Sequence, residues 1–226
     1  MLHFSTMQAP VALSSRPDLP FKFIGGDPSL DLVNTVDWTP RGLENERLTE
    51  YDRLTRWAEA AGLVSGREAG RLRRAGEARP AEAQAAYDLA RWLRWVLQRT
   101  YASLAAGKRP GAPLDEFNEL LADALRWLRI APMPPKRGAP SKVAEWAWHS
   151  REDNLGSLLW PVLWSAATLL TSEEARQIRV CAGPDCGWMY IDRSRNRLRR
   201  WCQMETCGTL EKSRRRRERG HGEADG

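Results

Sequence analysis

The four cysteines of this chain carry its clearest chemical pattern. They form two Cys-x4-Cys pairs separated by a spacer of fifteen residues, in the order Cys181, Cys186, Cys202 and Cys207. Four soft thiolate ligands complete the tetrahedral shell that Zn²⁺ prefers, and each pair can supply one edge of the tetrahedron. Gly183 and Pro184 bend the chain inside the first pair, while Gly187 and Gly208 directly follow the two pairs. The sequence therefore predicts one structural Zn²⁺ bound by all four cysteines.

The same thiols could instead form disulfide bonds or hold an iron–sulfur cluster. The N-terminal segment, however, has no basic residue before Arg16 and no continuous apolar stretch typical of a secretory signal. We therefore expect a cytoplasmic protein, whose thiols stay reduced. Because four protein thiolates leave no open coordination position, the metal is expected to be structural and not catalytic.

Positive charge is concentrated beside the cysteines. Residues 193–219 contain eleven Arg or Lys against three Glu, a local net charge of +8, whereas the whole chain carries +6 and the remainder therefore −2. A basic segment on a nearly neutral body favours a polyanionic partner, most commonly nucleic acid, although a solvated surface is the alternative. The candidate nucleic-acid contacts are Arg193, Arg195, Asn196, Arg197, Arg199, Arg200, Lys212, Arg214, Arg215, Arg216 and Arg217.

The segments around the cysteines predict a treble-clef-like zinc module. We expect strands over 187–192 and 197–202, joined by a turn at 193–196, and a helix over 208–220. The core of the module is expected to consist of three aromatic side chains, with base stacking as their alternative role: Trp188, Tyr190 and Trp201.

The expected strand would arrange the arginines in rows. Alternate residues of a strand share one face, so the arginines at odd positions from 193 to 199 would form one row and those of the helix a second. The planar guanidinium binds phosphate through two parallel hydrogen bonds, which supplies affinity, whereas reading a sequence requires contacts with base edges. The candidates for base-edge contacts are Asn196, Arg215 and Arg216.

The rest of the chain predicts a mainly helical body with a small antiparallel sheet, so that the fold class is α+β. Apolar residues recur at helical spacing in five segments, the last of them interrupted by Pro161: 48–61, 66–77, 81–106, 115–128 and 153–175. Strands are expected over 21–26, 129–133 and 142–149, while 28–37 is compatible with a helix or a strand. Asn34 and Thr35, polar residues after an apolar run, are expected to cap or tie down a neighbouring loop.

Residues 180–219 resemble the CGNR zinc-finger family, through two cysteine pairs, an Asp and Ser-Arg after the aromatic run, and Arg-Arg-Trp-Cys-x-Met-x-x-Cys-Gly at 199–208. The sequence departs from the family where Thr209 and Leu210 replace the Asn and Arg of Cys-Gly-Asn-Arg, so any contact made by those two residues in relatives is absent. The body is similar to the ABATE domain, through Gly-Gly-Asp-Pro-Ser-Leu-Asp-Leu-Val-Asn-Thr at 25–35. The resemblance implies a stress-induced transcription regulator with a DNA-binding finger.

These observations predict four parts: a loose tail over 1–20, an ABATE-like body over 21–176, a CGNR-like zinc finger over 177–220 and a tail over 221–226. We expect the finger to contact DNA and the body to sense a signal or mediate assembly, homo-oligomers included. An RNA- or ribosome-associated protein and an adaptor for an acidic protein partner are the alternatives. No apolar stretch is typical of a membrane span, and no nucleophile arrangement or nucleotide-binding loop indicates an enzyme.

Overall fold

The computed structural model describes residues 9–133, 143–149 and 154–214. Within these ranges helices dominate and the strands form three two-stranded antiparallel sheets, which confirms the α+β class. The α-helices are α1 (Pro28–Val33), α2 (Tyr51–Ala60), α3 (Gly66–Ala78), α4 (Pro80–Ala105), α5 (Ala112–Leu125) and α6 (Trp160–Leu170). The strand pairs are β1 (Asp37–Thr39) with β2 (Gly42–Glu44), β3 (Leu128–Pro132) with β4 (Ala144–Trp148), and β5 (Ile178–Val180) with β6 (Met189–Ile191).

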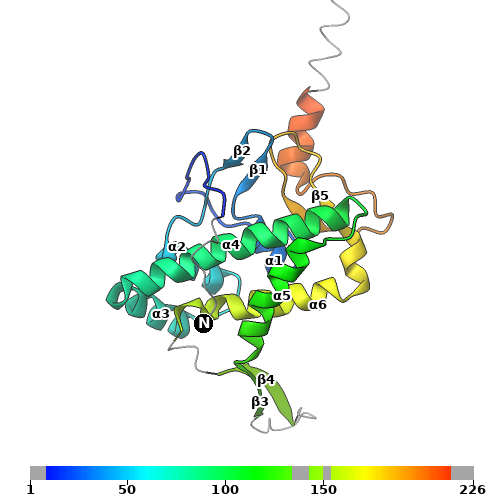
Figure 1. The fold of residues 1–226 in the computed structure, drawn as a ribbon. Helices are drawn as coiled ribbons and strands as arrows, with labels where there is room; N and C mark the ends of the chain where they lie inside the picture. Colours follow the sequence, from blue (N-terminus) through cyan, green and yellow to red (C-terminus); the bar gives the residue numbers. More distant parts are fainter. Residues whose placement is uncertain (1–8, 134–142, 150–153, 215–226) are drawn as a thin grey trace, which may run out of the picture.

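The helix α4 is the central element of the body. It crosses the molecule in Figure 1, and its apolar stripe contributes Ala90, Leu93, Val96 and Leu97, all fully buried, to the main core. Capping residues and glycines mark the ends of the helices around it. Ser65 forms a capping box at the start of α3, and Gly62, with a φ of +71°, ends the turn after α2. The four helices predicted over 48–128 are therefore confirmed, with ends shifted by a few residues.

The predicted helix over 153–175 is divided into three pieces. A 3₁₀ turn, η3 (Leu155–Leu159), leads into α6, and a second 3₁₀ turn, η4 (Glu173–Gln177), follows it. Pro161 lies at the first turn of α6, where its missing N–H leaves no helical hydrogen bond unmade. The interruption expected at Pro161 is thus a restart of the helix.

The hairpin β3–β4 confirms the two strands predicted there. Ile130 lies opposite Trp146 in its register, and Leu128 lies opposite Trp148. Trp148 packs against Trp160 of α6, which anchors the base of the hairpin to the core. The hairpin projects from the molecule at the end opposite to the zinc module (Figure 1).

The N-terminal part departs from the predictions. The strand predicted over 21–26 does not form. This segment runs beside the zinc module instead, where Ile24 packs on the module core and the carbonyl of Gly25 accepts from the Ile191 N–H at 2.9 Å. The segment 28–37 is a six-residue helix followed by the unpredicted hairpin β1–β2. Residues 13–16 bond to residues 43–46, so a loose tail over 1–20 is wrong for that part, and residues 1–8 lie outside the described ranges.

Candidate metal centre and nucleic-acid interface

The four cysteine sulfurs meet at one point. All of them lie within 4.8 Å of one another, and the Cys186–Cys202 and Cys202–Cys207 pairs of Sγ atoms are both 3.6 Å apart. A tetrahedral Zn²⁺ with bonds of about 2.3 Å has sulfur–sulfur edges of about 3.8 Å, so the arrangement fits such an ion. Two of the residues are buried and two are half-buried, which leaves no broad access to the centre. The cluster can therefore hold one metal ion in a closed, structural site.

Hydrogen bonds to Cys181 favour the thiolate form of this one cysteine. Its sulfur accepts from the backbone N–H of Cys202 at 3.3 Å and of Gly183 at 3.4 Å. Hydrogen bonds from the Cys186 and Cys202 thiols, followed by these backbone bonds, lower the pKa of Cys181 well below its ordinary value. Backbone N–H groups aimed at a thiolate disperse its charge, as they do around bound metal.

The first cysteine pair lies at the turn of a different hairpin from the predicted one. The strand β6 pairs with β5, which precedes Cys181, and not with 197–202, which contains no strand. Residues 181–188, which we call the knuckle, therefore connect β5 to β6. The pairing differs because Ile178 and Ile191, opposite each other in the register, are both buried against the body, an apolar contact unavailable to the arginine-rich segment after it.

The module is bound to the body through Asn34. Its side-chain amide donates to the carbonyl of Met189 at 2.8 Å, and its side-chain oxygen accepts from the Met189 N–H at 2.8 Å. Asn34 is only 2 % exposed and thus extends the strand β6 as a further hydrogen-bonding partner. The predicted role of Asn34, to tie down a neighbouring segment, is confirmed.

Asp37 supports the knuckle from the body side. Its carboxylate accepts from the indole N–H of Trp188 at 2.9 Å and from Arg47 at 3.0 Å, and Arg47 also stacks on the Trp188 ring at 4.9 Å. Gly187, with a φ of +64°, lies so close to Trp38 that an added Cβ would be 2.2 Å from the Trp38 carbonyl oxygen. Only glycine fits at this contact.

A buried ion pair joins α4 to the segment between β2 and α2. Arg94 of α4 bonds to both carboxylate oxygens of Glu46 and donates to the Thr35 hydroxyl at 2.9 Å, and Arg94 is 1 % exposed. Sequence reasoning missed Glu46, Arg94 and Asp37 as partners, because their charges lie far apart in the chain and only the fold brings them together. The one signal in the sequence that pointed to a buried ion pair was Arg94, a charged residue within the apolar stripe of the long helix α4.

The segment after β6 is a loop, which we call the tip loop (residues 193–200). Asp192, 1 % exposed, accepts from the Ser194 N–H and from the Arg199 N–H, both at 3.0 Å, and from the Ser194 hydroxyl. Arg197 has a φ of +53° and closes a turn by donating its N–H to the Ser194 carbonyl at 3.1 Å. The expected row of arginines on one strand face is therefore wrong, because this segment is held as a turn.

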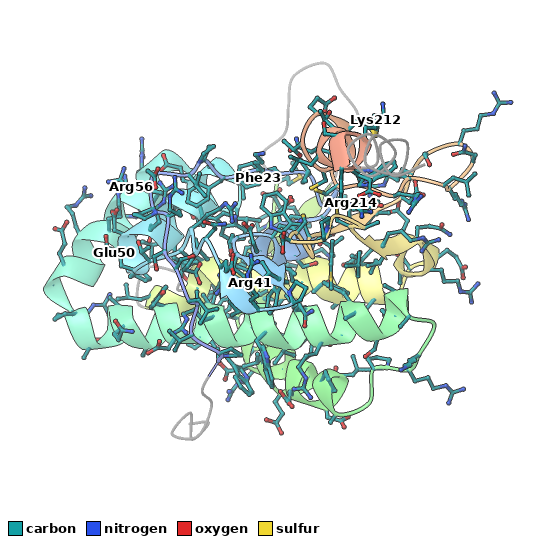
Figure 2. The ribbon with its side chains drawn as sticks, turned by 90° about the horizontal axis from the view of Figure 1, so that it is seen from above. Phe23, Arg41, Glu50, Arg56, Lys212 and Arg214 are labelled. Carbon is teal, nitrogen blue, oxygen red and sulfur yellow. The ribbon has the colours of Figure 1, made fainter. Side chains whose placement is uncertain are left out.

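The candidate nucleic-acid residues divide into three groups. Arg193 forms an ion pair with Glu174 at 2.6 Å, and the half-buried Arg199 stacks on Tyr190 and donates to backbone carbonyls of the module, so both serve the structure. The second group, exposed on the tip loop, consists of Arg195, Asn196, Arg197 and Arg200. Lys212 and Arg214 lie on the short helix after the second cysteine pair (Figure 2), with Arg214 paired to Glu211.

The remaining candidates, Arg215, Arg216 and Arg217, lie outside the described residues. The predicted helix over 208–220 is confirmed as far as residue 214, after a π turn, η5 (Met204–Gly208), that contains the last cysteine. Thr209 and Leu210 are both exposed at its start, so the two positions that depart from the family pattern face solvent. Trp188 and Tyr190 are buried and Trp201 is half-buried, which confirms them as the core of the module.

No described helix combines the length and the apolar character needed to cross a bilayer. A search of curated proteins found no match. Residues 177–220 match the model of the CGNR zinc finger, which covers both cysteine pairs and the tip loop. Residues 26–173, well over half of the chain, match the model of the ABATE family, described as "Putative stress-induced transcription regulator". The chain therefore belongs to the ABATE family and carries a CGNR zinc finger at its C-terminal end.

Proposed function

We propose that this protein is a cytoplasmic, non-enzymatic transcription regulator whose zinc module binds DNA. The ion in the cysteine cluster is Zn²⁺, held for structure alone. The body holds the module in a defined orientation and supplies the part that senses a signal or assembles with a second copy. The family description supports the regulatory role.

The tip loop carries the proposal. Arg195, Arg197 and Arg200 are exposed there, and among the described residues no carboxylate lies within salt-bridge distance of them. Elsewhere in the described structure, by contrast, many arginines are paired with acids, as Arg193, Arg47 and Arg94 show. Three guanidinium groups left without acids on one loop can each replace a counterion at a phosphate.

The exposed face of the hairpin β3–β4 supports an assembly role for the body. Ile130 and Trp146, which face each other across the two strands, are 67 % and 60 % exposed. Sedimentation velocity of the wild type and of the Ile130→Ser/Trp146→Ser variant tests the assembly role. If both proteins sediment as monomers, the body does not assemble through this hairpin.

The test of DNA binding compares two triple variants that lose the same charge. Arg195→Ala/Arg197→Ala/Arg200→Ala removes the tip-loop arginines, whereas Arg67→Ala/Arg71→Ala/Arg74→Ala removes three exposed arginines of α3 on the far side of the body (Figure 1). Affinity for duplex DNA is measured by fluorescence anisotropy over a salt series, on protein whose zinc content has been determined. We expect the first variant to reduce the slope of log K against log salt by about 2 to 3, and the second to leave it near the wild-type value.

Other outcomes assign the arginines differently. Tighter binding to structured RNA than to duplex DNA would replace the proposal by an RNA-associated role. One Zn²⁺ per chain without nucleic-acid binding would leave the module as a clamp for an acidic protein. Equal losses in both triple variants would mean that overall charge, and not the tip loop, determines binding.

A further inference from the structure

An exposed leucine lies among the arginines of the tip loop. Leu198 is 71 % exposed, whereas Trp188 and Tyr190 of the module core are almost completely buried. Arg197 precedes Leu198, and Arg195 and Arg200 lie within three residues of it. An apolar side chain of this size, presented to solvent and surrounded by cations, contributes little to folding.

The loop that presents Leu198 is held in place by hydrogen bonds and a stacking contact. Asp192 holds both ends of the loop, through the backbone N–H of Ser194 and of Arg199. Arg199 then fastens the loop to the module, because its guanidinium stacks at 4.1 Å on Tyr190, whose hydroxyl donates to the Arg199 carbonyl at 2.7 Å. The exposed side chains are thus already positioned, which lowers the entropy that binding must overcome.

The shape of the loop selects the groove that it fits. The major groove of B-DNA, about 12 Å wide, admits an α-helix or a two-stranded ribbon, whereas the minor groove is only about 6 Å wide. Residues 194–197 form a single tight turn with no strand beside it in the described structure. Proteins that bind the minor groove combine Arg or Asn side chains with an apolar wedge that enters between two base pairs.

We propose, on the basis of the function proposed above, that the tip loop docks in the minor groove of DNA, with Leu198 as the wedge. Arg195 and Arg197 contact the groove and its phosphates, and Asn196 reaches the acceptors on base edges. Leu198 partly unstacks one base step and bends the duplex. The partner is a duplex whose A·T-rich minor groove lacks the amino group of G·C and contains a pyrimidine–purine step, which unstacks easily.

Inosine substitution separates the two grooves. An I·C pair presents the major groove of G·C but lacks the amino group that G·C places in the minor groove. Three duplexes of one length are compared for binding to the zinc-loaded, full-length protein, with A·T, G·C or I·C pairs at the centre. We expect A·T and I·C to bind alike, each about tenfold more tightly than G·C. If I·C binds as weakly as G·C, the minor-groove assignment is wrong.

The wedge is tested with two leucines of nearly equal exposure. Leu198→Ala is compared with Leu210→Ala, which removes a side chain 69 % exposed on the short helix of the same module. Fluorescence energy transfer between dyes at the duplex ends reports the bend. For the wild type and Leu210→Ala we expect a bend of about 20° or more, and for Leu198→Ala most of the bend is lost while binding persists.

The results distinguish this inference from the proposed function. DNA binding that depends on the tip-loop arginines, without a bend and without preference for I·C, overturns the minor-groove docking and leaves the regulator intact. Equal bends in the wild type and Leu198→Ala remove Leu198 as the wedge. Absence of binding to all three duplexes overturns both proposals.

Discussion

The knuckle and the tip loop are two turns of the same zinc module with opposite roles. Each is organised by one aspartate: Asp37 from the body holds Trp188 of the knuckle, and Asp192 holds the ends of the tip loop. In the knuckle, the polar groups bond to the body, as between the Cys186 carbonyl and the Trp38 N–H at 3.0 Å. In the tip loop, Asp192 holds the backbone at Ser194 and Arg199, whereas the side chains of Arg195 and Arg197 are exposed.

If the tip loop binds DNA as proposed, positioning and binding are separated within about twenty residues of sequence. The knuckle fixes where the module lies on the body, and the tip loop determines what the module can contact. Changes in the knuckle should therefore alter stability first, whereas changes of the exposed tip-loop arginines Arg195 and Arg197 should alter binding alone.

Loss of the metal should have the largest effect. In Cys202→Ser, a hydroxyl replaces one thiolate ligand, so the metal content falls and the module unfolds, at a cost on the order of 10 kcal/mol in metal-binding free energy. Because Met189 and Ile191 pack into the main core, the melting temperature of the body should fall with it. Metal analysis and calorimetry measure both changes. Chelation of the wild type should give the same loss, and added Zn²⁺ should reverse it; a body that melts unchanged would contradict the docking.

Asn34→Ala should break the docking while leaving the metal bound. The substitution leaves the buried N–H and carbonyl of Met189 without partners, and we expect a loss of about 2 to 4 kcal/mol in the free energy of unfolding. The measurement is chemical denaturation, with Asn118→Ala, an exposed asparagine of α5, as the control. A loss in Asn118→Ala as large as in Asn34→Ala would show that the docking bonds contribute nothing specific.

Asp31, in the helix that receives the module, should make stability depend on pH. Burial, followed by the charge of Asp27, raises the pKa of Asp31 from its ordinary value of 3.8 to about 6, although it accepts from the Gly25 N–H at 2.8 Å. The folded state therefore binds the proton more tightly than the unfolded state. The contribution of Asp31 to the free energy of unfolding should fall by up to about 3 kcal/mol as the pH rises from about 4 to about 6.

Asp31→Asn removes this titration and still offers an oxygen to Gly25. Denaturation at several pH values should show the wild type losing stability relative to Asp31→Asn over that window, with a constant difference above it. The control, Asp88→Asn, changes an exposed carboxylate of α4. If the difference in free energy of unfolding between the wild type and Asp31→Asn does not vary with pH, the pKa of the buried Asp31 carboxyl is not raised.

The tip-loop arginines should matter least for stability. Arg195→Ala/Arg197→Ala removes two exposed side chains without acid partners among the described residues, so the free energy of unfolding should change by less than about 0.5 kcal/mol. Denaturation of this variant, beside its DNA affinity, checks the contrast with Asn34→Ala. A large loss of stability would mean that the arginines serve the module itself.

Much of the molecule follows from local chemistry in the sequence. The cysteine spacing with its glycines predicts the metal cluster, because the ligands lie on two short turns whose geometry is local. The helices over 48–128 follow from apolar periodicity, because a repeat of 3.6 residues over several turns has few other interpretations. The role of Asn34 in tying down a neighbouring segment could be predicted because it is a polar residue after an apolar run.

Only the tertiary structure decided which strand pairs with which and which charges are neutralised. The segment 197–202 has the composition of a strand, but its competitor β5 brings Ile178 to the core beside Ile191, and burial of apolar surface decides between them. Arg193 and Arg195 are equivalent in sequence, yet only Arg193 meets an acid, Glu174, from a distant turn. Spacing along the chain determines a metal site made of neighbours, whereas the pairing of charges depends on contacts that exist only after the chain has folded.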